Sequence, residues 1–341
     1  MPEQVTAFAP GRVNVIGEHT DYNAGLALPF AIAQGVTVRA RRTGGRRIRA
    51  VALDLGEEVS LEIGRCERIV GWRGFVHGAV AELTAAGYEL VAAELKISGT
   101  IAPGAGLASS AALSVALCLA LLSVSDRNLP SQLWLAHLCR HIENDWVGAA
   151  SGLLDQLASL SDGAVLIDFC SLEVSPIAFE LGDWRFVTLD SGQRHQNSAD
   201  REGYNARRAE CAQACSLLGV GSLRETVLEA AGTLPDPLAA RARHVLLENL
   251  RVEQTAAALT SGDLTTVGQL LDQSHASLRD LYEVSTPEVE LAVERLRGAG
   301  AAGVRMIGGG FGGHVLGLMP PGSAPPADAT VVTPAPGARL L

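Results

Sequence analysis

The sequence predicts an α/β protein of two domains, and three features of the chain support this fold class. Its 341 residues correspond to two domains at about 150 residues each. Short apolar and β-branched runs, which are typical of strands, are interspersed with longer segments of helical periodicity. Residues 171–180 show few periodic signals and form the candidate junction. We therefore expect domains at residues 1–170 and 171–341, with an approximate boundary.

The first half of the chain is rich in strand patterns. These lie at residues 5–16, 26–30, 36–42, 46–53, 58–63, 90–97 and 165–169. Helical spacing of apolar residues lies at residues 72–86, 107–124, 133–147 and 151–160. The first strand is interrupted at Pro10-Gly11 and then resumes. Six arginines flank a glycine-containing turn at residues 43–45, which favours a solvated hairpin of two antiparallel strands over a binding patch.

Helices dominate the second half of the chain. They are expected at residues 205–218, 238–259, 264–282 and 287–297, and strands at 186–190, 304–307 and 330–333. The last of these helices has a clear start signal, with Ser285 or Thr286 as the cap, Pro287 in the first turn and Glu288 nearby. Five glycines among residues 308–313 lie between apolar segments, which favours a packed loop that another group approaches closely.

Composition and charge exclude several classes of protein. The net charge of −10 argues against a nucleic-acid partner. Residues 107–124 carry no charge and reach the lower length limit of a membrane span. Four serines and the lack of flanking aromatic anchors favour a buried helix instead, so no membrane partner is expected. Six scattered cysteines without a Cys-x-x-Cys pair, and no signal peptide, predict free thiols and a cytoplasmic location. The oligomeric state stays open, with a monomer as one option.

The chain contains a single lysine, Lys96. A P-loop needs a lysine directly after its glycines, and a protein kinase needs one on its third strand. Lys96 has neither context. If the protein handles a nucleotide, backbone amides, arginines and a metal ion must therefore neutralise the phosphates.

The stretch that begins at Lys96 predicts a strand end, a glycine-rich turn and a helix start. Gly104 and Gly106 permit backbone conformations that other residues avoid. Ser109 and Ser110 stand at the helix start, where unpaired N–H groups and hydroxyls can bind an anion such as phosphate. A plain loop that leads into a core helix is the alternative, and the stretch alone does not decide between them.

A dense polar loop at residues 17–23 lies between apolar segments. Arg12, Glu18, His19 and Asp21 fall within ten positions of one another. Loops held by rigid strands are where binding residues concentrate. A surface turn would explain the same composition equally well.

Three motifs stand in order along the chain. They occupy residues 10–22 (Pro-Gly-Arg-Val-Asn-Val-Ile-Gly-Glu-His-Thr-Asp-Tyr), 103–112 (Pro-Gly-Ala-Gly-Leu-Ala-Ser-Ser-Ala-Ala) and 308–313 (Gly-Gly-Gly-Phe-Gly-Gly). Together they resemble the GHMP small-molecule kinases, and the first is similar to the signature of the galactokinase branch. Further matches extend the resemblance over nearly the whole chain, at residues 151–156, 190–192, 204–211 and 274–280.

This resemblance implies a fold and an activity. The fold would be the two-domain architecture of the GHMP kinases, with the active site in the cleft between the domains. The activity would be the ATP-dependent phosphorylation of galactose at its anomeric hydroxyl, which gives galactose 1-phosphate and ADP. Galactose and ATP would be the partners, and Mg²⁺ the metal cofactor.

The resemblance also implies a role for each matching residue. Asp155 would be the base that faces the anomeric hydroxyl, with Arg12 beside it, and Ser110 and Glu143 would hold Mg²⁺. The sugar would be bound by Glu18, His19, Asp21, Gly152 and Tyr204. The triphosphate of ATP would be wrapped by Pro103, Gly104, Ala105, Gly106, Leu107, Ala108, Ser109, Ser110 and Ala111.

The helical pattern and the resemblance disagree about Asp155. On a helix over residues 151–160 the leucines share one face, and Asp155 lies roughly opposite, at about 200° from Leu153. By pattern alone the carboxylate would be solvated. The resemblance instead predicts that this face lines the cleft.

The chain departs from the family pattern at four positions. Ala108 stands where a serine is common, Ser151 replaces a usual cysteine, Leu154 replaces a usual methionine, and His314 replaces a cysteine. None of these positions carries an implied catalytic role, although His314 could alter the wall of the cleft. Two alternatives stay open: a kinase for another sugar, such as galacturonate, arabinose or N-acetylgalactosamine, and a sensor that binds galactose and ATP without turnover.

Overall fold

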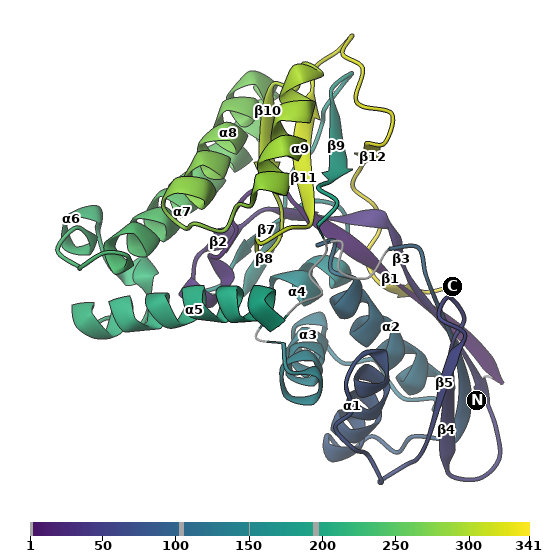
Figure 1. The fold of residues 1–341 in the computed structure, drawn as a ribbon. Coiled ribbons are helices and arrows are strands. Elements are labelled where there is room, and N and C mark those ends of the chain that lie inside the picture. The colour runs from purple at the N-terminus through teal and green to yellow at the C-terminus, as the bar shows by residue number, and fades with distance from the viewer. Residues whose placement is uncertain (1–2, 102–105, 150, 194–197) are drawn as a thin grey trace.

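The computed structural model describes residues 3–101, 106–149, 151–193 and 198–341 (Figure 1). The described strands form three sheets. The largest is six-stranded, in the order β13 (Arg339–Leu340), β1 (Gln4–Asn14), β3 (Pro29–Arg42), β6 (Ala93–Gly99), β4 (Arg47–Ala52) and β5 (Glu57–Glu62). A small sheet contains β2 (Leu26–Ala27), β7 (Val165–Asp168) and β8 (Glu173–Pro176).

Helices from the first half of the chain cover one face of the six-stranded sheet (Figure 1). They are α1 (Trp72–Ala85), α2 (Ser109–Val124), α3 (Gln132–His141) and α4 (Leu154–Leu160). Helix α2 packs directly on β1 and β3, and both α1 and α3 pack against α2. The uncharged segment that contains α2 is therefore core, as expected. None of the helices in the described parts of the chain is long and apolar enough to cross a membrane.

The second half builds a four-stranded sheet, on which two of its helices, α8 (Leu264–Asp280) and α9 (Pro287–Gly298), pack directly. The strand order is β10 (Gly303–Met306), β11 (His314–Met319), β9 (Arg185–Asp190) and β12 (Thr330–Val332). The helices are α5 (Ser198–Leu218), α6 (Leu228–Ala231), α7 (Leu238–Ser261), α8 (Leu264–Asp280) and α9 (Pro287–Gly298). The predicted start of α9 is confirmed, because the Thr286 side chain accepts a hydrogen bond from the N–H of Val289.

The expected hairpin around residues 43–45 is wrong. Strand β6 lies between β3 and β4; it pairs antiparallel with β3 and parallel with β4. A glycine-containing turn reverses the chain but does not decide which strands pair. Alternate residues of β6 (Ala93, Leu95 and Ile97) are buried in the core, and this apolar face gives β6 its central place in the sheet. The arginines of β3 and β4 face solvent, as predicted, and Arg41 and Arg49 pair with Glu94 and Glu58.

Two other predicted features take a different form. The first strand is not broken at Pro10-Gly11; it continues as β1 through a shift of register between Pro10 and Arg12, the kind of irregularity that re-aims the next side chain. The candidate junction at residues 171–180 contains β8, which pairs with β7. The division at residue 170 stays a prediction, and the last strand, β13, returns to pair with β1.

Candidate active site

Residues from distant parts of the chain line a cavity of about 920 Å³. The predicted site residues that line it are Arg12, Glu18, His19, Asp21, Gly106, Ala108, Ser109, Ser110, Glu143, Gly152, Asp155 and Tyr204. They come from β1 and the loop after it, from the start of α2, from the end of α3 onwards to α4, and from α5. The tertiary structure therefore gathers most of the predicted site in one place.

Arg12 and Asp155 form an ion pair inside this cavity. The guanidinium donates from Nε to Asp155 Oδ1 at 2.8 Å, and its Nη2 lies 2.7 Å from the same oxygen. Nη1 donates to the carbonyl of Gly106 at 2.6 Å. Arg12 is only 4% exposed, and its position follows the register shift in β1. One buried arginine thus joins the predicted base to the glycine-rich loop.

The position of Asp155 corrects the interpretation from helical pattern alone. Leu153, Leu154 and Leu157 are buried, while 26% of the Asp155 side chain stays exposed. That exposed side faces the cavity and Arg12, not bulk solvent. The pattern found the apolar face of α4 correctly, but periodicity cannot tell a solvated face from one that lines a cavity.

The loop after β1 presents three polar side chains to the cavity. The Thr20 hydroxyl lies within hydrogen-bond distance of the carbonyls of Gly17 and Leu26, at 2.8 and 2.7 Å, which closes the loop. His19 has a left-handed backbone, with φ of 63°. Burial first, and then the nearby Asp155 carboxylate, raise the pKa of Asp21 to about 6. Asp21 therefore changes charge close to neutral pH.

Gly152 leaves room for the Asp21 carboxylate. A Cβ at residue 152 would lie 1.6 Å from Asp21 Oδ2, much closer than any real contact. The predicted match at Gly152 thus has a steric reason, because any side chain there would displace Asp21.

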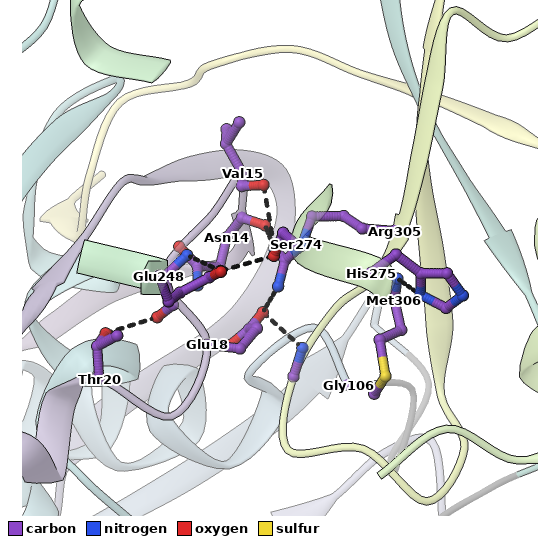
Figure 2. A network of polar contacts seen from close by, with 12 residues as sticks. Asn14, Val15, Glu18, Thr20, Gly106, Glu248, Ser274, His275, Arg305 and Met306 are labelled. Carbon is purple, nitrogen blue, oxygen red and sulfur yellow. Dashed lines mark hydrogen bonds and ion pairs between the residues drawn. The ribbon is translucent and has the colours of Figure 1, made fainter. Parts of the chain in front are cut away.

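Glu18 is held by residues from the second half of the chain (Figure 2). Its Oε1 accepts a hydrogen bond from the N–H of Gly308 at 2.8 Å and lies 3.5 Å from Arg305 Nη2. Arg305 is fully buried on β10, and its Nη1 donates to the carbonyls of Asn14 and Val15 at 3.0 Å. Burial raises the pKa of Glu18, and the charges of Arg305 and Arg12 oppose that rise.

A second buried carboxylate holds the same loop (Figure 2). Glu248 on α7 accepts hydrogen bonds from the N–H of Gly17 at 3.0 Å and from Ser274 Oγ at 2.6 Å. Its other oxygen accepts from Arg251 Nε at 2.8 Å. No local sequence signal indicates a role for Arg305 or Glu248, because each lies within a segment whose pattern is simply that of a core strand or helix.

Tyr204 reaches the cavity from α5. It packs against Gly309, where a Cβ would lie 2.8 Å from the tyrosine ring. The expectation of a packed, closely approached loop at residues 308–313 is confirmed at this point. His314 does not line the cavity; it pairs with Asp190 across β11 and β9.

The glycine-rich loop is described from Gly106 onwards, and Pro103, Gly104 and Ala105 lie outside the described residues. Ala108 has a left-handed backbone, with φ of 60°, and α2 begins directly after it. Leu107 and Ala111, which were also predicted to contact the triphosphate, do not line the cavity. The free N–H groups at the start of α2 suit an anion.

Ser110 and Glu143 lie together in the cavity wall. Glu143 belongs to a π-helical turn, Ile142–Trp146, which ends the predicted helix over residues 133–147 in an altered geometry. It accepts hydrogen bonds from Ser151 Oγ at 3.3 Å and from Gln156 Nε2 at 2.7 Å. Burial above all raises the pKa of Glu143 to about 7, although the nearby Ser110 hydroxyl opposes the rise.

The oxygen atoms of Ser110 and Glu143 are of the chemical type that Mg²⁺ prefers. Mg²⁺ prefers oxygen and commonly takes one or two protein ligands beside waters and substrate phosphates. No group of three or more His, Cys, Asp or Glu side chains that could hold a metal occurs in the described part of the chain. A metal bound at Ser110 and Glu143 would therefore need further oxygens from a substrate or water.

Part of the cavity lining is apolar and was not predicted. It consists of Val36, Trp72, Phe75, Ile97, Ile101 and Leu113, among others. These residues come from β3, α1, β6, α2 and the loop before α2. Each looked like ordinary core in the sequence, and no local signal distinguishes a cavity wall from the core.

Comparison with known proteins agrees with the three motifs. Residues 2–42 match the galactokinase galactose-binding signature, residues 74–163 the GHMP kinases N terminal domain and residues 255–332 the GHMP kinases C terminal model. The chain is 41% identical to the galactokinase of Mycobacterium bovis, over 93% of this chain and 89% of the relative. It is 39% identical to the galactokinase of Thermotoga petrophila, over 92% of this chain and 89% of the relative.

A solved structure extends the likeness to the fold. The galactokinase of Lactococcus lactis, complexed with galactose, superposes with a TM-score of 0.88 at 32% identity, over 99% of this chain and 95% of that one. The predicted α/β fold of GHMP-kinase type is thereby confirmed. From its motifs, its relatives and its fold, the chain belongs to the galactokinase family of the GHMP kinases.

Proposed function

We propose that this protein catalyses the ATP-dependent phosphorylation of galactose at its anomeric hydroxyl, with galactose 1-phosphate and ADP as products. One observation carries the proposal above the others. Arg12 binds both the Asp155 carboxylate and the carbonyl of Gly106, so a single side chain connects the residues proposed for the sugar with the loop proposed for the phosphates. Phosphoryl transfer depends on this kind of positioning more than on covalent chemistry.

In this proposal the sugar lies against the loop after β1. The carboxylates of Glu18 and Asp21 accept hydrogen bonds from sugar hydroxyls, and Tyr204 and His19 complete the wall, while Gly152 leaves space for Asp21. Asp155 accepts the proton of the anomeric hydroxyl as the oxygen attacks the γ-phosphorus. Arg12 keeps the carboxylate in place and provides a positive charge beside it.

ATP would lie along the rest of the cavity. The start of α2 offers N–H groups and the hydroxyls of Ser109 and Ser110 to the phosphates, and the apolar part near Trp72 and Phe75 suits the adenine base. Ser110 and Glu143 would hold Mg²⁺, which supplies positive charge to the phosphate oxygens. Their shared place in the cavity wall supports this pairing of ligands.

The proposal is tested by ADP release from the purified protein with ATP and a panel of sugars. Galactose should release ADP, and glucose should be a poor substrate, because a site that bonds a hydroxyl rejects an epimer that misplaces it. A higher specificity constant with galacturonate, arabinose or N-acetylgalactosamine would favour a different sugar kinase. Binding of galactose and ATP without ADP release would favour the sensor. The predicted cytoplasmic location would be checked separately by cell fractionation.

A further inference from the structure

Arg305 stands on an apolar face of β10. Its side chain is fully buried. Ile307, two residues further on, and Leu316, which pairs with Arg305 on β11, belong to one apolar cluster. The cluster also contains Val13 and Val15, on either side of the end of β1. A buried charge costs free energy unless another charge or hydrogen bonds compensate it. Packing alone would favour an aliphatic side chain at this position, so the partners of the guanidinium indicate its role.

The guanidinium of Arg305 has two backbone partners and one carboxylate (Figure 2). Its Nη1 donates to the carbonyls of Asn14 and Val15 at 3.0 Å. Its Nη2 lies 3.5 Å from Glu18 Oε1, and this is its one ion pair within the described part of the chain. Nε and Nη2 have no hydrogen-bond partner there. Because an arginine stays protonated in proteins, this buried positive charge is available to Glu18.

Arg12 is the other cation close to Glu18, but its charge is shared. Its Nη2 lies 2.7 Å from Asp155 Oδ1, and its Nε donates to the same oxygen at 2.8 Å. Asp21 is a second carboxylate of the site. Its pKa is raised by burial first, then by Asp155, and to a smaller extent by the charge of Glu18. Glu18 therefore has a like charge nearby, and Arg305 is the cation left to balance it.

The other titratable groups that act on Arg305 or Glu18 supply no free charge. They are His19, His244, His275, Tyr204 and Glu248. Burial lowers the pKa of each histidine and raises the pKa of the tyrosine well above its usual value, so these four side chains are neutral at neutral pH. Glu248 already pairs with Arg251, whose Nε donates to it at 2.8 Å and whose Nη2 lies 2.7 Å from the same oxygen.

The charge of Glu18 depends on Arg305 more than on any other charged group. Burial raises the pKa of Glu18, the charge of Arg305 is the largest effect that lowers it, and the charge of Arg12 follows. Without Arg305 the carboxyl would become protonated at a higher pH. A carboxylate only accepts hydrogen bonds, whereas a protonated carboxyl also donates one. The loss of the arginine would therefore change what Glu18 offers to the cavity.

We propose that Arg305 is a positioning residue for the sugar site, which keeps the Glu18 side chain ionised and in place in the cavity wall as a hydrogen-bond acceptor. The inference rests on the proposed function, which assigns Glu18 to the sugar. Glu18 lines the cavity, and 6% of its side chain stays exposed, whereas Arg305 is not part of the lining. Arg305 thus acts on the sugar through Glu18 and does not touch it.

The charge of Glu18 can be observed directly. Protein labelled with ¹³C-glutamate is titrated by NMR without sugar or ATP, and Glu18→Gln identifies the Glu18 carboxyl signal. Glu18 should be ionised in the wild-type protein at neutral pH, and in Arg305→Met it should titrate at a higher pH. A protonated Glu18 in the wild type at neutral pH, or an unchanged titration in Arg305→Met, would overturn the proposal. Because no substrate is present, this outcome is independent of whether the protein phosphorylates galactose.

Arg305→Lys keeps the positive charge, and it serves if Arg305→Met fails to fold. Glu18 should titrate in this variant close to the wild-type pH, because a cation still faces the carboxylate. Titration of Glu18 at a clearly higher pH in Arg305→Lys would mean that the charge at residue 305 does not hold Glu18 ionised, which contradicts the proposal.

Kinetics with galactose and ATP test the role in the sugar site. Arg305→Met should raise the KM for galactose about 10- to 150-fold, the loss of one hydrogen bond to a charged group, with little change in kcat. Arg295→Met is the matched control, because Arg295 is exposed on α9 and pairs with Asp328, and it should behave as wild type. An unchanged KM for galactose in Arg305→Met would mean that the arginine only fills the interior, and the proposal would fail.

A double variant separates the two kinds of contact that Arg305 makes. Arg305→Met also removes the hydrogen bonds to the carbonyls of Asn14 and Val15, and this loss acts on β1 whichever residue stands at position 18. In the Glu18→Gln background, Arg305→Met should therefore raise the KM for galactose much less than it does in the wild type. Equal increases in both backgrounds would mean that Arg305 acts through β1 alone, and the proposal would be wrong.

Discussion

Replacing Gly152 by alanine tests the sugar site through one defined contact. The added Cβ would lie 1.6 Å from Asp21 Oδ2 and 2.3 Å from Asp21 Cγ, whereas ordinary contacts begin at 3.4 Å. Gly152 does not lie in the left-handed region, so the alanine brings no backbone strain. Asp21 Oδ1 accepts from the N–H of Tyr22 at 2.9 Å, and the clash must break this arrangement and turn the carboxylate away.

The size of the effect follows from the interaction that is lost. A hydrogen bond to a charged group contributes about 1.5–3 kcal/mol, and 1.4 kcal/mol corresponds to about tenfold in binding. Gly152→Ala should therefore raise the KM for galactose roughly 10- to 150-fold. The KM for ATP should change much less, because the start of α2 is not touched.

Steady-state kinetics with galactose and ATP measure both constants. Gly298→Ala, at a glycine with nothing within 4 Å of the added Cβ, is the matched control and should behave as wild type. The double variant Gly152→Ala with Asp21→Ala should be no worse than Asp21→Ala alone, because the carboxylate that clashes is absent. An unchanged KM for galactose in Gly152→Ala, or additive losses in the double variant, would refute the reasoning.

Three further predictions concern the reaction and its pH dependence. Asp155→Asn keeps the shape of the side chain and removes its charge, so turnover should fall by about 10²–10⁴-fold while galactose and ATP still bind; a folded variant within tenfold of wild type would exclude a role as base. Ser110→Ala should lower kcat more than ATP affinity, since backbone amides remain; unchanged turnover at saturating Mg²⁺ would contradict the role as ligand. The pKa of Asp21, raised to about 6 mainly by burial, predicts that the KM for galactose rises as the pH falls below about 6, when the carboxyl becomes protonated. The same raised pKa means that the stability it contributes to the ligand-free protein is lost as the pH rises through about 6. Asp21→Asn should remove both dependences, in kinetics and in thermal unfolding; if the wild-type profiles persist in that variant, Asp21 is not the group that titrates.

The candidate site could be predicted from sequence where a short segment carries the information. Residues 17–21 combine acidic and imidazole groups in a loop between apolar strands, and Ser109 and Ser110 follow glycines at a helix start. Thr286 and Pro287 mark the start of α9 in the same local way. In each case the backbone conformation depends on neighbours along the chain, so the residue types suffice.

The arrangement of the sheet could not be read in this way. The turn at residues 43–45 has the composition of a hairpin turn. It connects β3 to β4, but β6 lies between these two strands in the sheet. Strand pairing depends on which apolar face can be buried in the core. The strand that pairs with β3, β6, begins only at Ala93, far along the chain from the end of β3 at Arg42. The position of Asp155 could not be predicted from periodicity either. A polar helix face gives the same sequence pattern whether it is exposed to solvent or lines a cavity.

The sequence by itself determined the family, the position of the helix start after the glycine-rich turn and the residues of the polar loop, because motifs and local conformation follow from adjacent residues. Only the tertiary structure decided that Arg12 joins Asp155 to Gly106 and that Arg305 and Glu248, from the second half of the chain, hold β1 and the loop after it. These contacts join residues up to 291 positions apart. Burial and hydrogen-bond partners at such separations arise from packing, which local sequence does not encode.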